Sequence, residues 1–277
     1  MSKKDSAKAT LNDLNGKEWV KATKSWFVVN PKPRSAGQAN HPAKYPEELV
    51  SRFLRFFTKA DAWVLDPFAG VGSTLVAAKE LGRNAIGVEL NGEYVEIGSR
   101  HLEKTKGSGR TYLIMGNAHG TLEHLGEIFK DSIPPFSLLM TSPPYWNMLR
   151  KSRGGNDSVQ KEREASGFDT YYSDSEEDIG NLDDYAEYID TIGEIFDRLE
   201  PILAKNAYLV IVVQNMRDID GEMKPIAWDL ARRLSKTYAL RQEMIWCQDN
   251  KRLGCWGYPT TYVSNVHHHH CLILQKR

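Results

Sequence analysis

Residues 62–90, AWVLDPFAGVGSTLVAAKELGRNAIGVEL, contain the pattern that decides the fold. The apolar run at 62–65 predicts a buried strand, and the spacing of apolar residues at 75–81 predicts a helix. Between them lies a turn, Asp66 to Thr74, that contains Gly70 and Gly72. A second strand is expected at 84–90. The order strand, glycine turn, helix, strand is typical of a βαβ unit in a parallel sheet.

The turn and the second strand together indicate a nucleoside ligand. Gly70 and Gly72 lack Cβ atoms, so a ligand can approach their backbone, and the helix that follows presents free N–H groups. Glu89 ends the second strand, where a carboxylate can accept hydrogen bonds from both hydroxyls of a ribose. The turn has neither the G-x-G-x-x-G pattern nor the lysine of a triphosphate loop, which disfavours dinucleotides and ATP.

A second motif, Thr141-Ser-Pro-Pro-Tyr-Trp146, follows a predicted buried strand at 136–140. Two consecutive prolines have a fixed φ and no N–H group, so the chain leaves the sheet along one stiff path. Ser142, a proline carbonyl and Tyr145 could accept hydrogen bonds from an exocyclic amine, beside a flat aromatic surface. This combination predicts a pocket for a planar base.

Strand and helix patterns alternate along most of the chain, which predicts an α/β fold with a doubly wound, mostly parallel sheet. We expect seven strands, with an antiparallel strand at one edge, and treat 26–40 as loop. Residues 1–25 are expected to form a flexible arm and 26–277 a single domain, in which the polar segment 147–181 is an insertion. Further helices are expected at 47–57, 92–104, 122–132, 182–204 and 225–236, and further strands at 112–115, 208–213, 238–247 and near 267–274.

Composition and net charge add little to the prediction of function. The chain has 36 Lys and Arg against 36 Asp and Glu, so net charge does not support nucleic-acid binding, and a basic face must be local. Three cysteines without C-x-x-C spacing fit reduced thiols. With no apolar run of about 18 residues and no signal peptide, we expect a cytoplasmic protein that does not bind membranes. No metal site is expected, because the adjacent histidines 267–270 would point to alternate faces of a strand.

The two motifs resemble those of the amino-methylating DNA methyltransferases, which modify N4 of cytosine or N6 of adenine with S-adenosylmethionine. Asp66-Pro-Phe-Ala-Gly-Val-Gly is similar to their cofactor motif and Thr-Ser-Pro-Pro-Tyr-Trp to their catalytic motif. His41-Pro-Ala-Lys-Tyr-Pro46 is similar to a third family element, which packs against the methionine end of the cofactor. The resemblance implies a seven-stranded class I methyltransferase sheet and direct methyl transfer to the amine of a flipped base.

The resemblance also assigns roles to individual residues. The catalytic group is Ser142, Pro143, Pro144 and Tyr145, with Tyr145 and Trp146 stacking on the base. Asp66 is expected to bind the methionine ammonium, and Asn117 stands where the family often has an aspartate for the adenine amine. The cofactor-binding set is His41, Pro42, Asp66, Pro67, Phe68, Gly70, Gly72, Ser73, Thr74, Glu89, Asn117 and Thr141. The DNA-binding candidates are the basic residues of the insertion, Arg150, Lys151, Arg153, Lys161 and Arg163.

Several alternatives remain open. In the family that the chain resembles, a serine at the position of Ser142 goes more often with N4-cytosine than with N6-adenine, so the resemblance favours N4-cytosine as the target of a site-specific enzyme on double-stranded DNA. RNA or protein-glutamine methylation, and a non-catalytic subunit that binds cofactor and DNA, are the other possibilities. The base-reading segment is expected in 147–181 or near 249–265, where Trp256, Tyr258 and Tyr262 are stacking candidates. A restriction-modification system is the expected setting, with a cognate endonuclease or a companion specificity subunit as partner.

Overall fold

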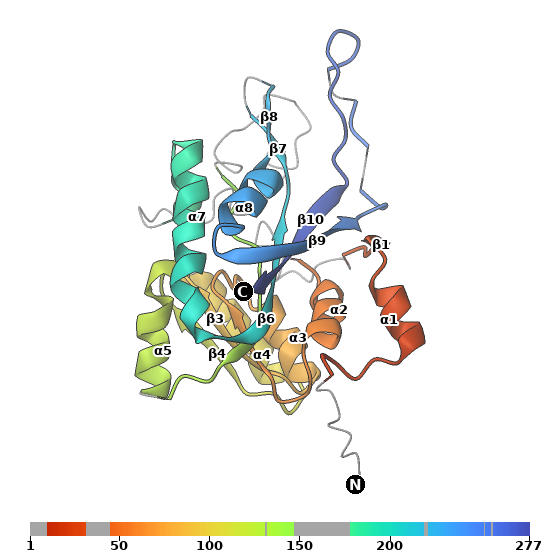
Figure 1. The fold of residues 1–277 in the computed structure, drawn as a ribbon. Helices are drawn as coiled ribbons and strands as arrows, with labels where there is room; N and C mark the ends of the chain where they lie inside the picture. The colour runs from red at the N-terminus through yellow and green to blue at the C-terminus, as the bar shows by residue number, and fades with distance from the viewer. Residues whose placement is uncertain are drawn as a thin grey trace.

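A single eight-stranded sheet with helices on both faces forms the body of the protein (Figure 1). The computed structural model describes residues 10–31, 45–130, 132–146, 178–218, 221–251, 253–255 and 257–277. The strands of the main sheet are β1 (Trp26–Val28), β2 (Trp63–Asp66), β3 (Asn84–Glu89), β4 (Thr111–Met115), β5 (Phe136–Thr141), β6 (Leu203–Val213), β9 (Tyr238–Cys247) and β10 (His268–Lys276). The α-helices are α1 (Gly16–Ala22), α2 (Glu47–Phe57), α3 (Ser73–Glu80), α4 (Gly92–Lys104), α5 (Thr121–Phe129), α7 (Tyr185–Leu199) and α8 (Ile226–Leu234).

Shorter elements complete the described chain. They are the 3-10 turns η2 (Ala118–Gly120), η3 (Ile179–Asn181) and η4 (Glu200–Ile202), and the small hairpin of β7 (Met216–Arg217) and β8 (Met223–Lys224). The helix expected at 182–204 ends at Leu199, because Pro201 stands in the first turn of η4 and cannot donate to a continuing helix. None of the helices in the described ranges is long and apolar enough to cross a membrane.

The order of the strands places the ends of β2 and β5 side by side. The sheet runs β1-β9-β10-β6-β5-β2-β3-β4, so the chain moves outward from β2 to β4 and then returns to the other side of β2. β2 and β5 are parallel, with Leu65 opposite Leu139. Ligands of open α/β sheets bind at the carboxyl ends of the strands where the order reverses, which here is the junction of β2 and β5.

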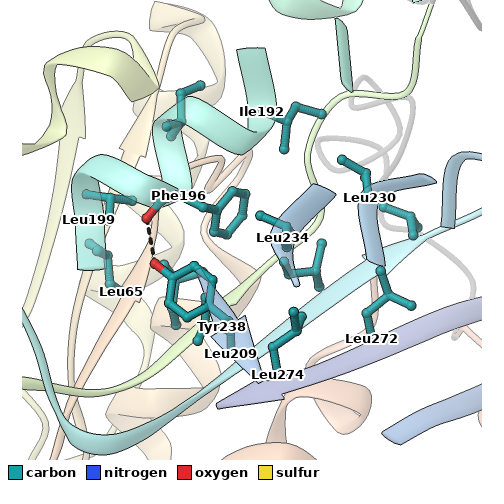
Figure 2. Packing of buried hydrophobic residues seen from close by; sticks show 14 of the residues in the cluster. Leu65, Ile192, Phe196, Leu199, Leu209, Leu230, Leu234, Tyr238, Leu272 and Leu274 are labelled. Carbon is teal, nitrogen blue, oxygen red and sulfur yellow. Dashed lines mark hydrogen bonds between the residues drawn. The ribbon is translucent and has the colours of Figure 1, made fainter. Parts of the chain in front are cut away.

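Two hydrophobic cores cover the two faces of the sheet, and neighbouring residues of each strand alternate between them. Leu209 and Leu272 face the core under α5, α7 and α8, whereas Val210 and Cys271 face the core under α2, α3 and α4. Figure 2 shows the first core, where the hydroxyl of Tyr238 donates to the carbonyl of Phe196 over 2.5 Å. Alternation with both faces apolar is the pattern of a strand buried on both sides.

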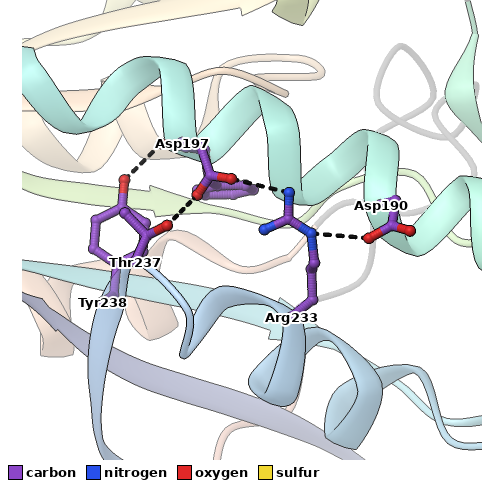
Figure 3. A network of polar contacts seen from close by, with 6 residues as sticks. Asp190, Asp197, Arg233, Thr237 and Tyr238 are labelled. Carbon is purple, nitrogen blue, oxygen red and sulfur yellow. Dashed lines mark hydrogen bonds and ion pairs between the residues drawn. The ribbon is translucent and has the colours of Figure 1, made fainter.

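A polar network joins α7 to α8 at the edge of that core (Figure 3). The Arg233 guanidinium lies 2.9 Å from Asp190 through Nε and 2.9 Å from Asp197 through a terminal nitrogen. Thr237 donates to the second oxygen of Asp197. The network fixes α7 over the sheet, and Ile195 of α7 reaches the cavity described below.

The α/β class and the mostly parallel sheet are confirmed, but the expected strand count and the position of the antiparallel strand are wrong. The eighth strand is β1, which lies within the segment expected to be loop and pairs in parallel with β9. β10 is the antiparallel strand, and it lies inside the sheet between β9 and β6. Three residues carry too little periodicity to predict β1 from sequence.

The expected flexible arm at 1–25 is also wrong in its second half, while residues 1–9 lie outside the described part. Asn15 caps α1 through a reciprocal capping box with Glu18. The helix is held to α2 by two contacts, since Trp19 contacts Phe56 at 4.8 Å between ring centroids and Arg52 donates to the carbonyl of Ala22. The polar composition of this segment reflects its solvent-facing side.

Candidate functional site

The glycine turn is built by left-handed backbone at two positions. Gly70 has φ +53° and Gly72 φ +80°, which L-residues with a Cβ rarely adopt. The N–H of Gly70 therefore points at β3, where it donates to Glu89 Oε2 over 2.7 Å. The N–H of Asn91 donates to Glu89 Oε1 over 2.8 Å, so the carboxylate is fixed between two backbone donors.

The charge state of Glu89 is set by its surroundings. Burial raises the pKa of Glu89 to about 7, and the negative charges of Asp66 and Asp178 add to that effect. The hydrogen bonds from Asn91 and Gly70 act in the opposite direction. Glu89 consequently titrates near neutral pH, as groups in binding clefts often do.

Asp66 occupies a different place from the one expected. Its carboxylate is fully buried and does not line the cavity. Thr141 donates to Oδ1 over 2.6 Å, and Tyr45 and Thr74 donate to Oδ2 over 2.8 and 2.5 Å. Burial raises the pKa of Asp66, and these hydrogen bonds lower it in part.

The predicted contact between Asp66 and a methionine ammonium is therefore not what the geometry favours. Asp66 instead ties the end of β2 to the end of β5 through Thr141, because the two residues end adjacent parallel strands. A buried carboxylate is tolerated when donors satisfy it, and here three hydroxyls and the N–H of Phe68 do so. Asp66 thereby keeps the glycine turn next to the double-proline motif.

The double-proline motif opens onto the same cavity as the glycine turn. Ser142, Pro143 and Pro144 line one wall, and Phe68, Gly70 and Glu89 are among the residues lining the others. The Tyr188 hydroxyl donates to the Pro144 carbonyl over 2.9 Å, which fixes the second proline from α7. The expectation that the two bends are neighbours in space is confirmed.

Tyr145 and Trp146 do not line this cavity, contrary to the expectation that both rings face a base. Each side chain is only 6% exposed and belongs to the core under α7. The indole N–H of Trp146 donates to the Leu182 carbonyl over 2.8 Å, and its ring contacts Tyr185 edge-on. The Tyr145 hydroxyl lies near His269 of β10. Polar partners inside the protein hold both rings away from the cavity.

The cavity encloses about 870 Å³, including its mouth, and most of its lining is apolar. Of the predicted cofactor residues, Pro67, Phe68, Gly70, Ser73, Glu89 and Asn117 line it, whereas Gly72, Thr74 and Thr141 support it from behind. Asn117 lies on the wall and accepts a hydrogen bond from the N–H of Gly120 over 2.8 Å. His41 and Pro42 lie outside the described residues, as do Arg150, Lys151, Arg153, Lys161, Arg163 and Trp256.

Sequence reasoning missed four polar or aromatic residues of the cavity. Tyr45, Tyr94, His119 and Asp178 line it, and Asp178 comes at the end of the segment taken as an insertion. Tyr45 belongs to the third motif, whose position just before α2 was a usable signal. The other three had none, since a lone tyrosine, histidine or aspartate is ordinary in a helix or turn.

The histidines 268–270 alternate between the faces of β10, as expected. The rings of His268 and His270 lie 5.2 Å apart, and His269 stacks on Trp246 on the other face. Within the described ranges, no group of three or more His, Cys, Asp or Glu side chains is arranged to hold a metal ion.

Comparisons with known proteins agree with this site. Residues 1–100 match the family model described as DNA methylase, a range that includes the glycine turn and Glu89 and ends before the double-proline motif. The type II methyltransferase M2.DpnII of Streptococcus pneumoniae is 36% identical over 93 residues, which cover 34% of this chain and 34% of that protein. Over this part of its length the chain is similar to DNA methylases.

Two further curated proteins share similar stretches with this chain. The type II methyltransferase M2.LlaDCHI of Lactococcus lactis subsp. cremoris is 42% identical over 102 residues, 37% of this chain and 36% of that protein. The DNA adenine methyltransferase YhdJ of Escherichia coli is 42% identical over 64 residues, 23% of this chain and 22% of that protein. The matched stretches thus span about a third or less of these relatives.

The resemblance to DNA methyltransferases implies S-adenosylmethionine as the cofactor, and the cavity has the features that this cofactor requires. Glu89 offers a fixed carboxylate at the end of β3 for two ribose hydroxyls. Gly70 has no side chain to block approach to the turn, and Phe68 and Val88 supply apolar walls. The residues present fit the group.

Proposed function

We propose that this protein transfers a methyl group from S-adenosylmethionine to the exocyclic amine of a base in double-stranded DNA. The observation that carries the proposal is one cavity lined both by the glycine turn with Glu89 and by Ser142, Pro143 and Pro144. A donor held by the first set lies beside an acceptor held by the second. When bound, the cofactor supplies an electrophilic methyl group on a sulfonium.

The cofactor side of the cavity has distinct proposed roles. Glu89 accepts hydrogen bonds from the ribose hydroxyls. The backbone from Phe68 to Gly70 receives the methionine end, with Pro67 and Ser73 beside it. Asn117, on the wall after β4, contacts the adenine edge through its side-chain amide.

The acceptor side of the cavity is proposed to increase the reactivity of the exocyclic amine. The lone pair of an exocyclic amine is delocalised into the ring, so the amine is a weak nucleophile until both of its N–H bonds are held out of the ring plane. Ser142 Oγ and the Pro143 carbonyl are the proposed acceptors, since the Pro144 carbonyl already accepts from Tyr188. With cofactor bound, the amine nitrogen would form its bond to the methyl group as the sulfur–methyl bond breaks, leaving S-adenosylhomocysteine, and the extra proton on the nitrogen would pass to solvent water. Positioning contributes most of the rate gain.

The target base has to leave the duplex to reach this cavity. An exocyclic amine inside the base stack cannot approach a buried donor, so the nucleotide is flipped out. Ser142 favours N4 of cytosine as the acceptor. N6 of adenine is the second candidate, because the relative YhdJ is named as an adenine methyltransferase.

The DNA-facing side is proposed at the carboxyl edge of the sheet. The chain between β9 and β10 projects from that edge as an arm (Figure 1). Tyr258 and Tyr262 on this arm are 81% and 85% exposed. The basic residues of 147–181 remain candidates for phosphate contacts. A restriction-modification system is the proposed setting, with a cognate endonuclease or specificity subunit as partner.

The direct test incubates the protein with methyl-labelled cofactor and DNA of varied sequence, then digests the DNA to nucleosides. We expect label in N4-methylcytosine, and label in N6-methyladenine would reassign the base. Transfer to RNA or protein but not DNA would refute the proposal, as would binding of cofactor and DNA without turnover.

A matched pair of serine variants tests the site itself. Ser142→Ala removes a hydrogen-bond acceptor of the amine and should lower kcat about 10- to 100-fold, the worth of a strong hydrogen bond. Ser132→Ala, at an exposed serine ten residues earlier, should leave kcat unchanged.

A further inference from the structure

Three side chains, two from the segment after β5 and one from β10, form a short hydrogen-bonded series behind the cavity. Ser142 Oγ donates to the Tyr145 hydroxyl over 3.4 Å, and that hydroxyl lies 3.3 Å from His269 Nδ1. Ser142 is on the cavity wall, whereas Tyr145 is buried and does not line it. The proposed catalytic serine is thus connected to β10, which lies inside the sheet between β9 and β6.

The histidine at the end of this series is held in place by packing. Its ring stacks on Trp246 with centroids 4.5 Å apart and planes 21° apart. The Trp246 indole donates to the Val29 carbonyl over 2.8 Å, which anchors it to the chain after β1. The rings of His268 and His270 lie on the opposite face of β10, and His269 is the histidine whose Nδ1 lies beside the Tyr145 hydroxyl.

Neutral imidazole has one donor and one acceptor nitrogen, and a tyrosine hydroxyl has a single proton to donate. If Ser142 donates to the Tyr145 oxygen, the tyrosine proton is free to go to His269 Nδ1. We propose that Tyr145 and His269 are positioning residues that turn the Ser142 proton away from the cavity. The serine lone pairs then face the amine of the target base.

The series orients protons and does not carry them. Burial lowers the pKa of His269 to about 3, with the positive charge of Lys251 adding to it, so the ring stays neutral. Burial raises the pKa of Tyr145 to about 12. A proton lost by the methylated amine has no stable resting place on either group. The inference rests on the proposed function, because it assigns a task to Ser142 in that reaction.

Kinetics of four variants and one control variant test the inference. Tyr145→Phe and His269→Leu should each lower kcat about tenfold with the KM for S-adenosylmethionine unchanged. The double variant should be no slower than Tyr145→Phe alone, because His269 acts only through the tyrosine hydroxyl. His269→Asn keeps an acceptor atom near the Nδ1 position and should recover most of kcat. His268→Leu, on the opposite face, is the control.

Additive losses in the double variant would overturn the inference, as would an Asn variant as slow as the Leu variant. A loss confined to thermal stability would mean a structural role only. If the wild type methylates no DNA, the proposed function fails and the series is judged by ¹⁵N-histidine NMR. We expect an unprotonated Nδ1 on His269 whose shift moves in Tyr145→Phe, and a protonated Nδ1 would reverse the series and refute it.

Discussion

Glu89 is the residue whose charge should govern cofactor affinity. In the proposed binding mode its carboxylate accepts hydrogen bonds from the ribose hydroxyls, and only the deprotonated form can do so with both oxygens. Because its pKa is raised to about 7, affinity should be constant above that pH and fall about tenfold per pH unit below it. Titration calorimetry with S-adenosylhomocysteine between pH 5.5 and 8.5 measures this.

A pair of variants distinguishes the titration of Glu89 from other effects of low pH on cofactor affinity. Glu89→Gln should weaken binding about 10- to 100-fold at pH 8 and remove the pH dependence. Glu93→Gln, at an exposed carboxylate in the first turn of α4, should change neither. Unchanged pH dependence in the Glu89 variant would show that another group titrates.

Glu89 and Asp66 show how far the site could be predicted from residues. Glu89 was predictable, because its place at the end of a strand follows from the local βαβ pattern. The role of Asp66 was not, since its partners Tyr45, Thr74 and Thr141 lie 21, 8 and 75 residues away. A motif identifies a side chain near a site, but only packing decides whether it faces ligand or protein.

At the scale of single elements, two helical glycines offer a matched test of the α7–α8 contact. A Cβ on Gly193 of α7 would lie 2.4 Å from the Arg233 guanidinium, whereas a Cβ on Gly126 of α5 would meet nothing within 4 Å. Gly126→Ala should stabilise by about 0.5–1 kcal/mol, the helix-propensity difference. Gly193→Ala should destabilise by about 1 kcal/mol, because it displaces Arg233 from Asp190 and Asp197.

Urea unfolding midpoints measure both glycine variants. Equal stabilisation by the two changes would mean that Arg233 moves at no cost and that its ion pairs contribute little. That outcome is a real alternative, since Asp190 is 63% exposed and exposed ion pairs are often weak.

The arm between β9 and β10 is the element for which a DNA-binding test is sharpest. Tyr258→Ala and Tyr262→Ala should each weaken DNA binding about tenfold, within the range for an aromatic ring that stacks on a base. Cofactor affinity should not change. Tyr112→Ala, on edge strand β4 at the other end of the sheet, is the control for loss of a surface tyrosine. Fluorescence anisotropy with labelled duplex measures the affinity, and equal losses in all three variants would exclude a specific role for the arm.

At the scale of the whole molecule, the cavity collects residues from both sides of the strand-order reversal, so its ligand should stabilise the entire sheet. S-adenosylhomocysteine at 100 times its Kd should add about 2.7 kcal/mol to the free energy of unfolding. Thermal denaturation with and without ligand measures it. ATP and NAD, which the glycine turn disfavours, should give no shift, and an equal shift with ATP would argue for a less selective nucleotide site.

Most of the sheet was predictable because its strands are local, periodic and buried on both faces. β1 was not, because its three residues gain their structure from β9, more than 200 positions later. The position of β10 within the sheet could not be predicted from the sequence either. A hairpin pattern predicts that β9 and β10 pair, but not that β10 also pairs with β6.

The place of β10 has a consequence for how the chain assembles as it is made. β1 and β9 share hydrogen bonds with each other, and only β10 joins them to β6 and the rest. β10 is also the latest of the described strands to leave the ribosome. Until it emerges, one side of β6 has no partner, and such an open strand edge invites pairing with other chains. Nascent copies of this protein should therefore depend on chaperones until β10 pairs with β6 and β9.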